Sequence, residues 1–321
     1  MKKTFFAVLA ATVMLFGLSG CSQKKGGENA AETEGEVVAE EVTEQTQLAP
    51  FEYTPAEPVD GKQKAVVELG ASGFNLFIIE IDQNGNWKAL KKEFGSSLVA
   101  ENMTDAETVK SKLQDYIQSI VSFGVPATNI YFVVSSGAAK EEIVGVITKA
   151  LKKIGYFVNT VSPEEEAAFA FRCTLPKGFE DKAFVVDIGS GNTKVSYLQD
   201  GKTVAKESYG AKYFQKEITD EAAYDDMKAQ VADVPAANTE TLFLIGGVPF
   251  QMAKMLKKGD ERYTVLSTNL ADYDDLVQEN GEKMKAGLNL YKAILDGTGA
   301  KQVVFDWDAN FTIGFLLSLK Y

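Results

Sequence analysis

The chain has 321 residues and a formal net charge of −12, with no histidine and only two cysteines. The lack of histidine excludes Ser-His-Asp and Cys-His catalysis, and zinc sites built on imidazole. The acidic charge argues against nucleic acid as a partner, because nucleic-acid-binding domains carry basic patches.

The first 21 residues have the pattern of a bacterial lipoprotein signal. Lys2 and Lys3 precede the apolar run FFAVLAATVMLFGL, and small residues then lead to Cys21. This order is typical of a secretory signal, and the run is too short for a comfortable membrane-spanning helix. We therefore expect residues 1–21 to be a signal peptide, with Cys21 lipidated on the periplasmic or surface face of a membrane, outside the cytoplasm. A chance cysteine behind an uncleaved anchor is the alternative.

Residues 22–63 are rich in Glu, Thr, Ala and Gly, with prolines near the end. Their apolar content is too low to bury a core, which predicts a disordered acidic tether. With Cys21 lipidated, the other cysteine, Cys173, has no partner for a disulfide.

The rest of the chain contains one pattern of elements twice. Residues 64–94 predict a strand, a turn with Gly70, a strand, an Asn-Gly turn and a strand. Residues 183–210 predict the same order, and strands alternating with amphipathic helices follow both copies. This repeat predicts two similar α/β halves, residues 64–180 and 181–308, with a terminal helix at 309–321 that packs on the first half.

The elements after each first hairpin are read from hydrophobic periodicity. In the first half they are a helix at 104–124, a strand at 129–136, a helix at 138–155 and a strand at 156–162. In the second half they are a strand at 241–247, a helix from about Pro249, a helix near 280–296 and a strand at 301–307.

The turn in DIGSGNTK, Asp187 to Lys194, is wider than a plain hairpin requires. Gly189 and Gly191 allow positive φ and a close approach of the backbone to an anion, and successive amides in such a turn form a nest for phosphate. Asp187, at the end of its strand, suits Mg²⁺, which binds few carboxylates together with phosphate oxygens. A hairpin with a merely generous turn is the alternative.

Three glutamates begin the helix predicted after Ser162. Ser162 as N-cap, Pro163 at the first helical position and Glu165 form a capping box, and Glu164 suits the helix dipole. Glu166 is not needed for capping, which leaves another role open for it. A third solvated glutamate is the alternative.

The ordered set of motifs resembles the exopolyphosphatase and guanosine pentaphosphate phosphatase (Ppx/GppA) family of the actin-like ATPase superfamily. No single motif is specific, but their order over residues 64–321 is. The motifs are ELGASGF (68–74), SGAAK (136–140), SPEEEAAFAF (162–171), DIGSGNTK (187–194), the Gly246-Gly247 turn and the closing segment 286–317.

The resemblance implies two duplicated actin-like (ribonuclease H-like) α/β domains, each with a mixed five-stranded sheet flanked by helices, and a cleft between them. It implies that Glu166 is the general base that activates water, and that Asp187 and Glu68 are ligands of Mg²⁺. The phosphate-binding residues that it implies are Gly70, Ala71, Ser72, Lys140, Gly189, Ser190, Gly191, Asn192, Thr193, Gly246 and Gly247.

Four residues depart from the family pattern. Glu68 replaces an aspartate, Ala71 a hydroxyl residue, Lys140 an arginine fork, and Lys194 a glutamate expected beside the metal. Lys194 either neutralises phosphate without a metal or pairs with Asp187 and closes the site.

Two functions follow from the resemblance and these departures. The first is a membrane-anchored phosphohydrolase that releases the terminal phosphate of polyphosphate or a polyphosphorylated nucleotide, using Glu166 and Mg²⁺. The second is a catalytically degenerate lipoprotein that binds a phosphate ligand or acts as a scaffold. An ATP-driven cycle is weaker, because free ATP is scarce outside the cell. A homodimer is compatible with the sequence.

Overall fold

The computed structural model of the chain describes residues 49–70, 73–96 and 106–320. The predicted signal peptide with Cys21, most of the predicted tether, and the phosphate-binding candidates Ala71 and Ser72 lie outside the described residues. Within these ranges, no helix combines the length and the apolar character needed to cross a membrane.

The first half is built on a five-stranded sheet in the order β3-β2-β1-β4-β5. The first three strands form an antiparallel meander, and β4 and β5 continue the sheet in parallel. The bounds are β1 (Lys62–Gly70), β2 (Gly73–Ile81), β3 (Trp87–Ser96), α1 (Ala106–Phe123), η1 (Ala127–Asn129), β4 (Ile130–Val134), α2 (Glu142–Lys153), β5 (Val158–Thr160) and α3 (Pro163–Thr174).

The second half repeats this plan with one strand more, in the order β10-β11-β9-β6-β7-β8. The extra strand, β10, extends the sheet antiparallel to β11, so the prediction of five strands was wrong for this sheet; α4 was also not predicted. The bounds are β6 (Ala183–Ile188), β7 (Asn192–Gln199), β8 (Lys202–Tyr209), η2 (Tyr213–Lys216), α4 (Asp220–Val231), η3 (Ala236–Thr239), β9 (Thr241–Gly246), α5 (Gly247–Leu256), β10 (Tyr263–Leu266), η4 (Leu270–Tyr273), α6 (Asp274–Thr298), β11 (Gln302–Asp306) and α7 (Phe311–Ser318).

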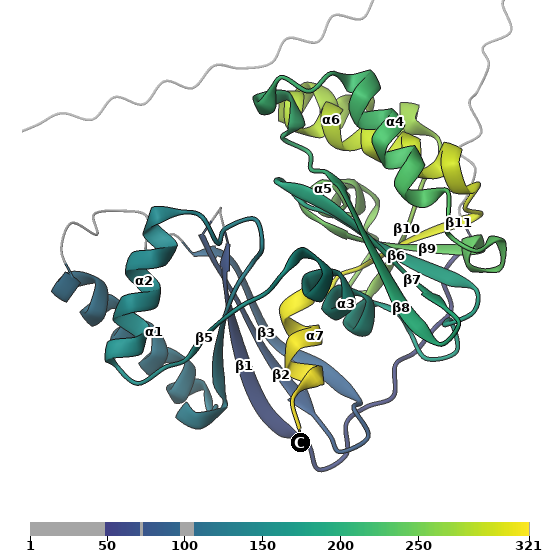
Figure 1. Ribbon diagram of the computed structural model, residues 1–321. Helices are drawn as coiled ribbons and strands as arrows, with labels where there is room; N and C mark the ends of the chain where they lie inside the picture. Colours follow the sequence, from purple (N-terminus) through teal and green to yellow (C-terminus); the bar gives the residue numbers. More distant parts are fainter. Residues whose placement is uncertain (1–48, 71–72, 97–105, 321) are drawn as a thin grey trace, which may run out of the picture. The chain divides into compact units, whose positions relative to one another are not determined.

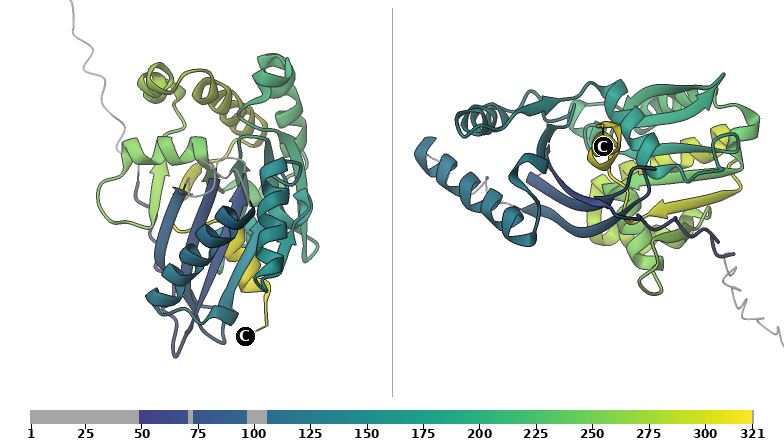
Figure 2. Two further views of the ribbon diagram at one scale, coloured as in Figure 1. Left: turned by 90° about the vertical axis from the view of Figure 1, so that its left-hand side faces the viewer. Right: turned by 90° about the horizontal axis from the view of Figure 1, so that it is seen from below.

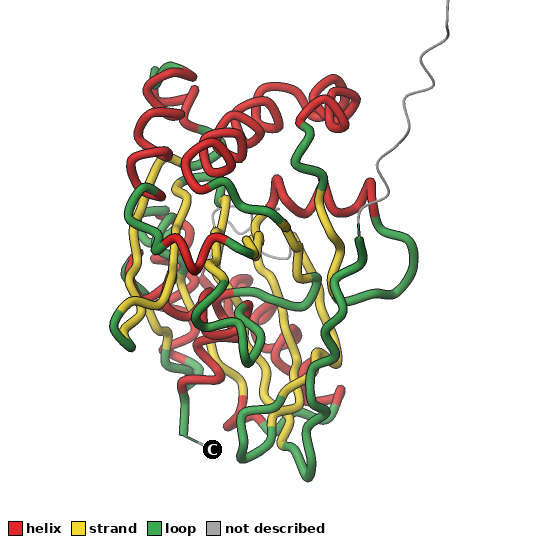
Figure 3. The backbone as a smooth tube through the Cα atoms, turned by 90° about the vertical axis from the view of Figure 1, so that its right-hand side faces the viewer, coloured by secondary structure: helices red, strands yellow, loops and turns green. Residues whose placement is uncertain are grey.

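Helices and sheets alternate in layers (Figure 1, Figure 2). The outer face of the first sheet packs on α1 and α2, and that of the second sheet on α4, α5 and α6, because both faces carry runs of buried apolar residues. Between the sheets, α7 contacts β1 and β2, and α3 contacts β6, β7 and β8. Figure 3, seen from the side of the second sheet, shows its strands in yellow with helices above them.

Residues 49–61 contact both halves, although they fall within the predicted disordered tether. Glu57 pairs with Lys88 of β3 at 3.1 Å, and β1 begins at Lys62. The ring of Phe51 lies 5.4, 5.4 and 5.2 Å from those of Phe179, Phe243 and Tyr263, measured between centroids. An average over the composition of residues 22–63 hid this half-buried ring, so the predicted boundary at 63 was too late.

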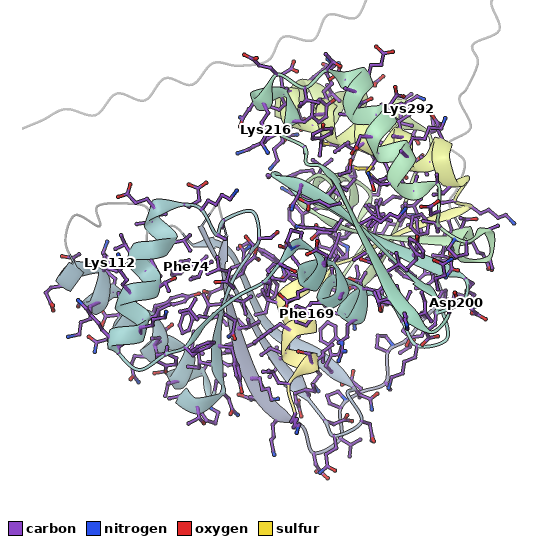
Figure 4. The ribbon with its side chains drawn as sticks, viewed as in Figure 1. Phe74, Lys112, Phe169, Asp200, Lys216 and Lys292 are labelled. Atoms are coloured by element: carbon purple, nitrogen blue, oxygen red, sulfur yellow. The ribbon has the colours of Figure 1, made fainter. Side chains whose placement is uncertain are left out.

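The two middle helices, α3 and α7, cross where α7 has a glycine. Phe169 of α3, labelled in Figure 4, stacks edge-on against Phe315 of α7 at 5.8 Å. A Cβ added at Gly314 would lie 1.8 Å from the carbonyl oxygen of Phe169, so the close approach of the helices requires glycine there.

We expect Gly314→Ala to lower the free energy of unfolding by about 3 kcal/mol, because the helices must separate. Gly145→Ala in α2 is the matched control: its Cβ would meet open space, and alanine there should stabilise the helix by about 0.5 to 1 kcal/mol. Urea denaturation of both variants measures the difference, and a Gly314→Ala variant as stable as the wild type would contradict the close packing.

Candidate functional site

The candidate residues come together at the carboxyl ends of β1 and β6. Glu68 lies near the end of β1 and Asp187 near the end of β6, and both are half-buried. Asp187 is the cross-strand partner of Lys194 on β7. Directly opposed residues of an antiparallel pair share one face of the sheet, and this face packs against α3.

Glu166 is buried between the two halves, with 4% of its surface exposed. Its Oε2 accepts hydrogen bonds from the N–H and the hydroxyl of Ser136, at 2.8 and 2.5 Å, in the loop after β4. Its Oε1 lies 2.5 Å from Nζ of Lys194, which is also 4% exposed. The alternative of a solvated glutamate is therefore wrong.

The start of α3 explains why Glu166 points inward. Ser162 and Glu165 form the predicted capping box, with the N–H of Glu165 donating to Ser162 Oγ and that of Ser162 donating to Glu165. Glu164 and Glu165 are exposed. Because successive residues turn by about 100° around a helix, Glu166 faces the second sheet instead of solvent.

Lys194 does not pair with Asp187, as one of the two expectations had it, but with Glu166. Its charge still acts on Asp187. Burial raises the pKa of Asp187, the positive charge of Lys194 opposes that rise, and the negative charge of Glu166 adds to it. The ammonium group of Lys194 thus pairs with Glu166 and also stabilises the charged form of Asp187.

Glu68 is held by two asparagine side chains. Its Oε2 accepts hydrogen bonds from Asn75 at 2.9 Å and from Asn310, the N-cap of α7, at 3.2 Å. Burial raises the pKa of Glu68 to about 7; the charges of Glu166 and Asp187 add to the rise, and the two amides oppose it. The sequence analysis did not find these asparagines, and the only signal for Asn310 was its place before a helix.

The turn after β6 is shaped differently from the prediction. Neither Gly189 nor Gly191 has positive φ. Gly189 is required because a Cβ there would lie 2.6 Å from the carbonyl oxygen of Asn192, whereas a Cβ at Gly191 would meet open space. The N–H groups of Ser190 and Gly191 donate to no acceptor among the described residues, so they are available to an anion.

The Gly246-Gly247 turn lies beside Asp187. Gly246 has a φ of +107°, and a Cβ there would lie 2.4 Å from the carbonyl oxygen of Ile188 and 2.9 Å from Asp187 Oδ1. This position therefore requires glycine. Gly247 begins α5 and is exposed.

The other predicted phosphate-binding residues are placed less favourably. Thr193 is fully buried on the opposite face of β7 from Lys194, and its hydroxyl has no hydrogen-bond partner within the described ranges. The Asn192 amide already donates to Glu207 at 2.8 Å and to Ser136 at 3.4 Å. Lys140 is exposed in the turn before α2, and Gly70 ends β1 beside Glu68.

The carboxylates fit Mg²⁺ only as a site shared with a ligand. In the part of the chain that the structure describes, no group of three or more acidic, Cys or His side chains could hold a metal. Mg²⁺ commonly uses one or two carboxylates together with water and phosphate oxygens. Asp187 and Glu68 are two such carboxylates. Burial raises the pKa of both carboxyls, which works against a metal, and a bound cation would oppose that rise by favouring their charged forms.

No protein-family model and no curated protein matches the sequence. Solved structures are similar in fold. A Ppx/GppA family member from Aquifex aeolicus has a TM-score of 0.60 at 17% identity, covering 80% of this chain and 97% of that one. An exopolyphosphatase from Cytophaga hutchinsonii has a TM-score of 0.57 at 16% identity, covering 79% and 96%. An exopolyphosphatase-like protein has a TM-score of 0.58 at 15% identity, covering 81% and 98%.

These identities are low, so the likeness is one of fold. The chain has the fold of the Ppx/GppA structures, and the prediction of an actin-like α/β architecture is confirmed.

The ion pair of Lys194 with Glu166 gives the first prediction from the site. Lys194→Met leaves a buried carboxylate without its cation, and we expect the free energy of unfolding at pH 7 to fall by about 3 to 5 kcal/mol. The double variant Lys194→Met, Glu166→Gln removes both charges and should be more stable than Lys194→Met alone. Urea denaturation measures both.

Glu164→Gln is the matched control, because it makes the same exchange at an exposed position in the same helical turn. It should change the free energy of unfolding by less than about 1 kcal/mol. A double variant less stable than Lys194→Met would show that the pair does not carry the effect.

The raised pKa of Glu68 gives a second prediction. Between the ordinary pKa of 4.5 and the folded value of about 7, the folded protein keeps a proton that the unfolded chain has released. Glu68 therefore lowers the free energy of unfolding as pH rises through this range. Glu68→Gln removes that contribution, so the variant should gain stability relative to the wild type, by up to about 3 kcal/mol at pH 7 and above.

Urea denaturation between pH 4.5 and 8, in EDTA and without phosphate, measures this difference. Glu142→Gln, at an exposed glutamate of α2, controls for the exchange itself. A difference between Glu68→Gln and wild type that stays constant with pH would contradict the prediction.

Proposed function

We propose that the chain binds the phosphate end of a phosphoanhydride, either polyphosphate or a polyphosphorylated nucleotide, and that the Lys194–Glu166 ion pair suppresses its hydrolysis. The observation that carries this proposal is the occupation of both Glu166 oxygens, one by Lys194 and one by Ser136. Three hydrogen bonds leave this carboxylate one of about four lone pairs. A general base must accept a proton from water, and a protonated Glu166 would leave the buried Lys194 ammonium without its counter-charge. One of the structures with a similar fold is an exopolyphosphatase, which supports the class of ligand.

The binding chemistry uses the turn after β6 and the two half-buried carboxylates. The N–H groups of Ser190 and Gly191 would donate to the terminal phosphate. Asp187 and Glu68 would hold Mg²⁺ together with phosphate oxygens, and the metal would supply positive charge against the anionic ligand. On this proposal Mg²⁺ is required for tight binding, because the two carboxylates would otherwise repel the phosphate.

Hydrolysis is the second candidate function, and the position of Glu166 beside Asp187 and Lys194 favours it. An incoming phosphate would attract the Lys194 ammonium and free Glu166 Oε1. Glu166 would then take a proton from a water molecule whose oxygen attacks the terminal phosphorus, while the bond from that phosphorus to the bridging oxygen breaks.

The location proposed for this activity is the cell envelope. It rests on the signal pattern before Cys21, which would become lipidated and hold the folded part outside the cytoplasm through the acidic tether. Fractionation of a Cys21→Ser variant tests this: the protein should move from the membrane to the soluble fraction.

The experiment measures binding and phosphate release together, with full-length protein in detergent. Polyphosphate and guanosine pentaphosphate are each added with Mg²⁺ or with EDTA. We expect Mg²⁺-dependent binding, no more phosphate release than from an Asp187→Asn variant, and release gained in Lys194→Glu or Lys194→Met. Thermal unfolding confirms that each variant is folded.

Two outcomes would decide otherwise. Mg²⁺-dependent release by the wild type that Glu166→Gln abolishes would establish the hydrolase instead. A folded wild-type protein that binds neither ligand would refute both functions. A role as a scaffold would then be the remaining hypothesis.

A further inference from the structure

Two lysines outside all of the predicted motifs lie near the site, one beside the Gly246-Gly247 turn and one next to the turn after β6. The first is Lys283 of α6. A Cβ added at Gly247 would lie 3.7 Å from its Nζ, so the half-buried ammonium group lies against the first residue of α5.

Lys283 is poorly placed for helix stability. Gly281, with a φ of +63°, interrupts α6 two residues earlier, so Lys283 lies in the first turn of the segment that follows. The N-terminal end of a helix carries partial positive charge and disfavours a cation there. Helix propensity and capping therefore do not explain this lysine.

The second lysine, Lys212, is held between the turn after β6 and α6. Its N–H donates to the carbonyl oxygen of Ser190 at 3.0 Å. The next residue, Tyr213, is buried; its hydroxyl donates to Asp220 at 2.7 Å and accepts from Asn289 of α6 at 3.0 Å. Tyr213 begins η2, which ends at Lys216, labelled in Figure 4.

The two ammonium groups repel one another. Burial lowers the pKa of Lys283, and the charge of Lys212 lowers it further. Neither lysine forms a salt bridge within the described ranges, whereas Lys285, two residues after Lys283, pairs with Asp220 at 3.1 Å. The repulsion between the two ammonium groups raises the electrostatic free energy, and a bound anion would lower it.

Asp187, the Gly246-Gly247 turn and Lys283 follow one another in space. Asp187 Oδ1 lies against Gly246, and Lys283 Nζ lies against Gly247, the next residue. The two glycines carry no side chains that would obstruct a ligand between them. A ligand with its terminal phosphate at Asp187 would pass over Gly246 and Gly247 and meet the lysines with its next anionic group.

We propose that Lys212 and Lys283 form a second anion subsite, which binds an inner phosphate of a ligand whose terminal phosphate lies at Asp187 and the turn after β6. The inference rests on the proposed function and deepens it. It assigns the ligand that occupies both subsites as a chain of linked phosphates. Orthophosphate and phosphate monoesters cannot reach both subsites.

The test compares a short phosphate chain with a single phosphate. Isothermal titration calorimetry measures the binding of tripolyphosphate and of orthophosphate to the full-length protein in detergent with Mg²⁺. The variants are Lys283→Met and Lys212→Met, which keep an unbranched side chain without its charge. Lys285→Met is the matched control, because it removes the same charge from the same helix at a lysine already paired with Asp220.

We expect Lys283→Met and Lys212→Met each to weaken tripolyphosphate binding about tenfold or more while leaving orthophosphate binding unchanged. Lys285→Met should change both by less than about threefold. Lys212 is exposed, so its variant tests the subsite even if Lys283→Met impairs folding, which thermal unfolding monitors.

Two results would overturn the subsite while leaving the proposed function intact. In one, the two variants bind tripolyphosphate as Lys285→Met does. In the other, they weaken orthophosphate and tripolyphosphate equally, which would place the lysines at the terminal phosphate. Failure of the folded wild type to bind tripolyphosphate at all would instead refute the proposed function, and the subsite with it.

Discussion

The carboxylate of Glu166 is the point on which the site depends, because it bonds to both halves of the molecule at once. Ser136, from the end of the first sheet, donates to one oxygen, and Lys194, from the second sheet, donates to the other. The pair is buried, so its charges are compensated chiefly by one another. A change in the spacing of the two sheets must break one of these contacts or move α3, which carries Glu166.

The same interaction sets the electrostatics of the surrounding groups. The charges of Glu166 and Asp187 add to the raised pKa of Glu68, the charge of Glu166 adds to that of Asp187, and Lys194 is the cation beside them. Since Lys194 is bonded to Glu166, the compensation is uneven: Glu68 has only amide donors, and burial raises its pKa to about 7. Asp187 and Glu68 are the two carboxyls that remain half-buried, and they are the pair proposed to take a metal shared with phosphate.

The sequence predicted those features that depend on local pattern. The duplicated order of elements and the capping box at Ser162 follow from periodicity and capping chemistry, whereas the grouping of the Gly246-Gly247 turn with Asp187 was implied only by the resemblance. The pairing of Lys194 with Glu166 could not be predicted, because it depends on how α3 packs against a strand 28 residues away. Gly189 was identified for the wrong reason, since contact with Asn192 and not φ requires it. Phe51 was missed because one half-buried ring does not change the composition of a polar segment.

Lys194, the residue that departs most from the pattern of the family that the chain resembles, also balances the charge of the carboxylates without a metal. A glutamate at position 194 would place a fourth carboxylate beside Glu68, Glu166 and Asp187, an arrangement that repels itself unless a divalent cation is present. Lys194 reverses the sign of that charge, so the fold closes around its own ion pair. On the proposed function, Mg²⁺ at Asp187 and Glu68 would lie beside an internal cation that already pairs with Glu166. On the proposed function, the ion pair of Lys194 with Glu166 stabilises the protein when no ligand is bound. The same pair then favours retention of a phosphate chain over its cleavage.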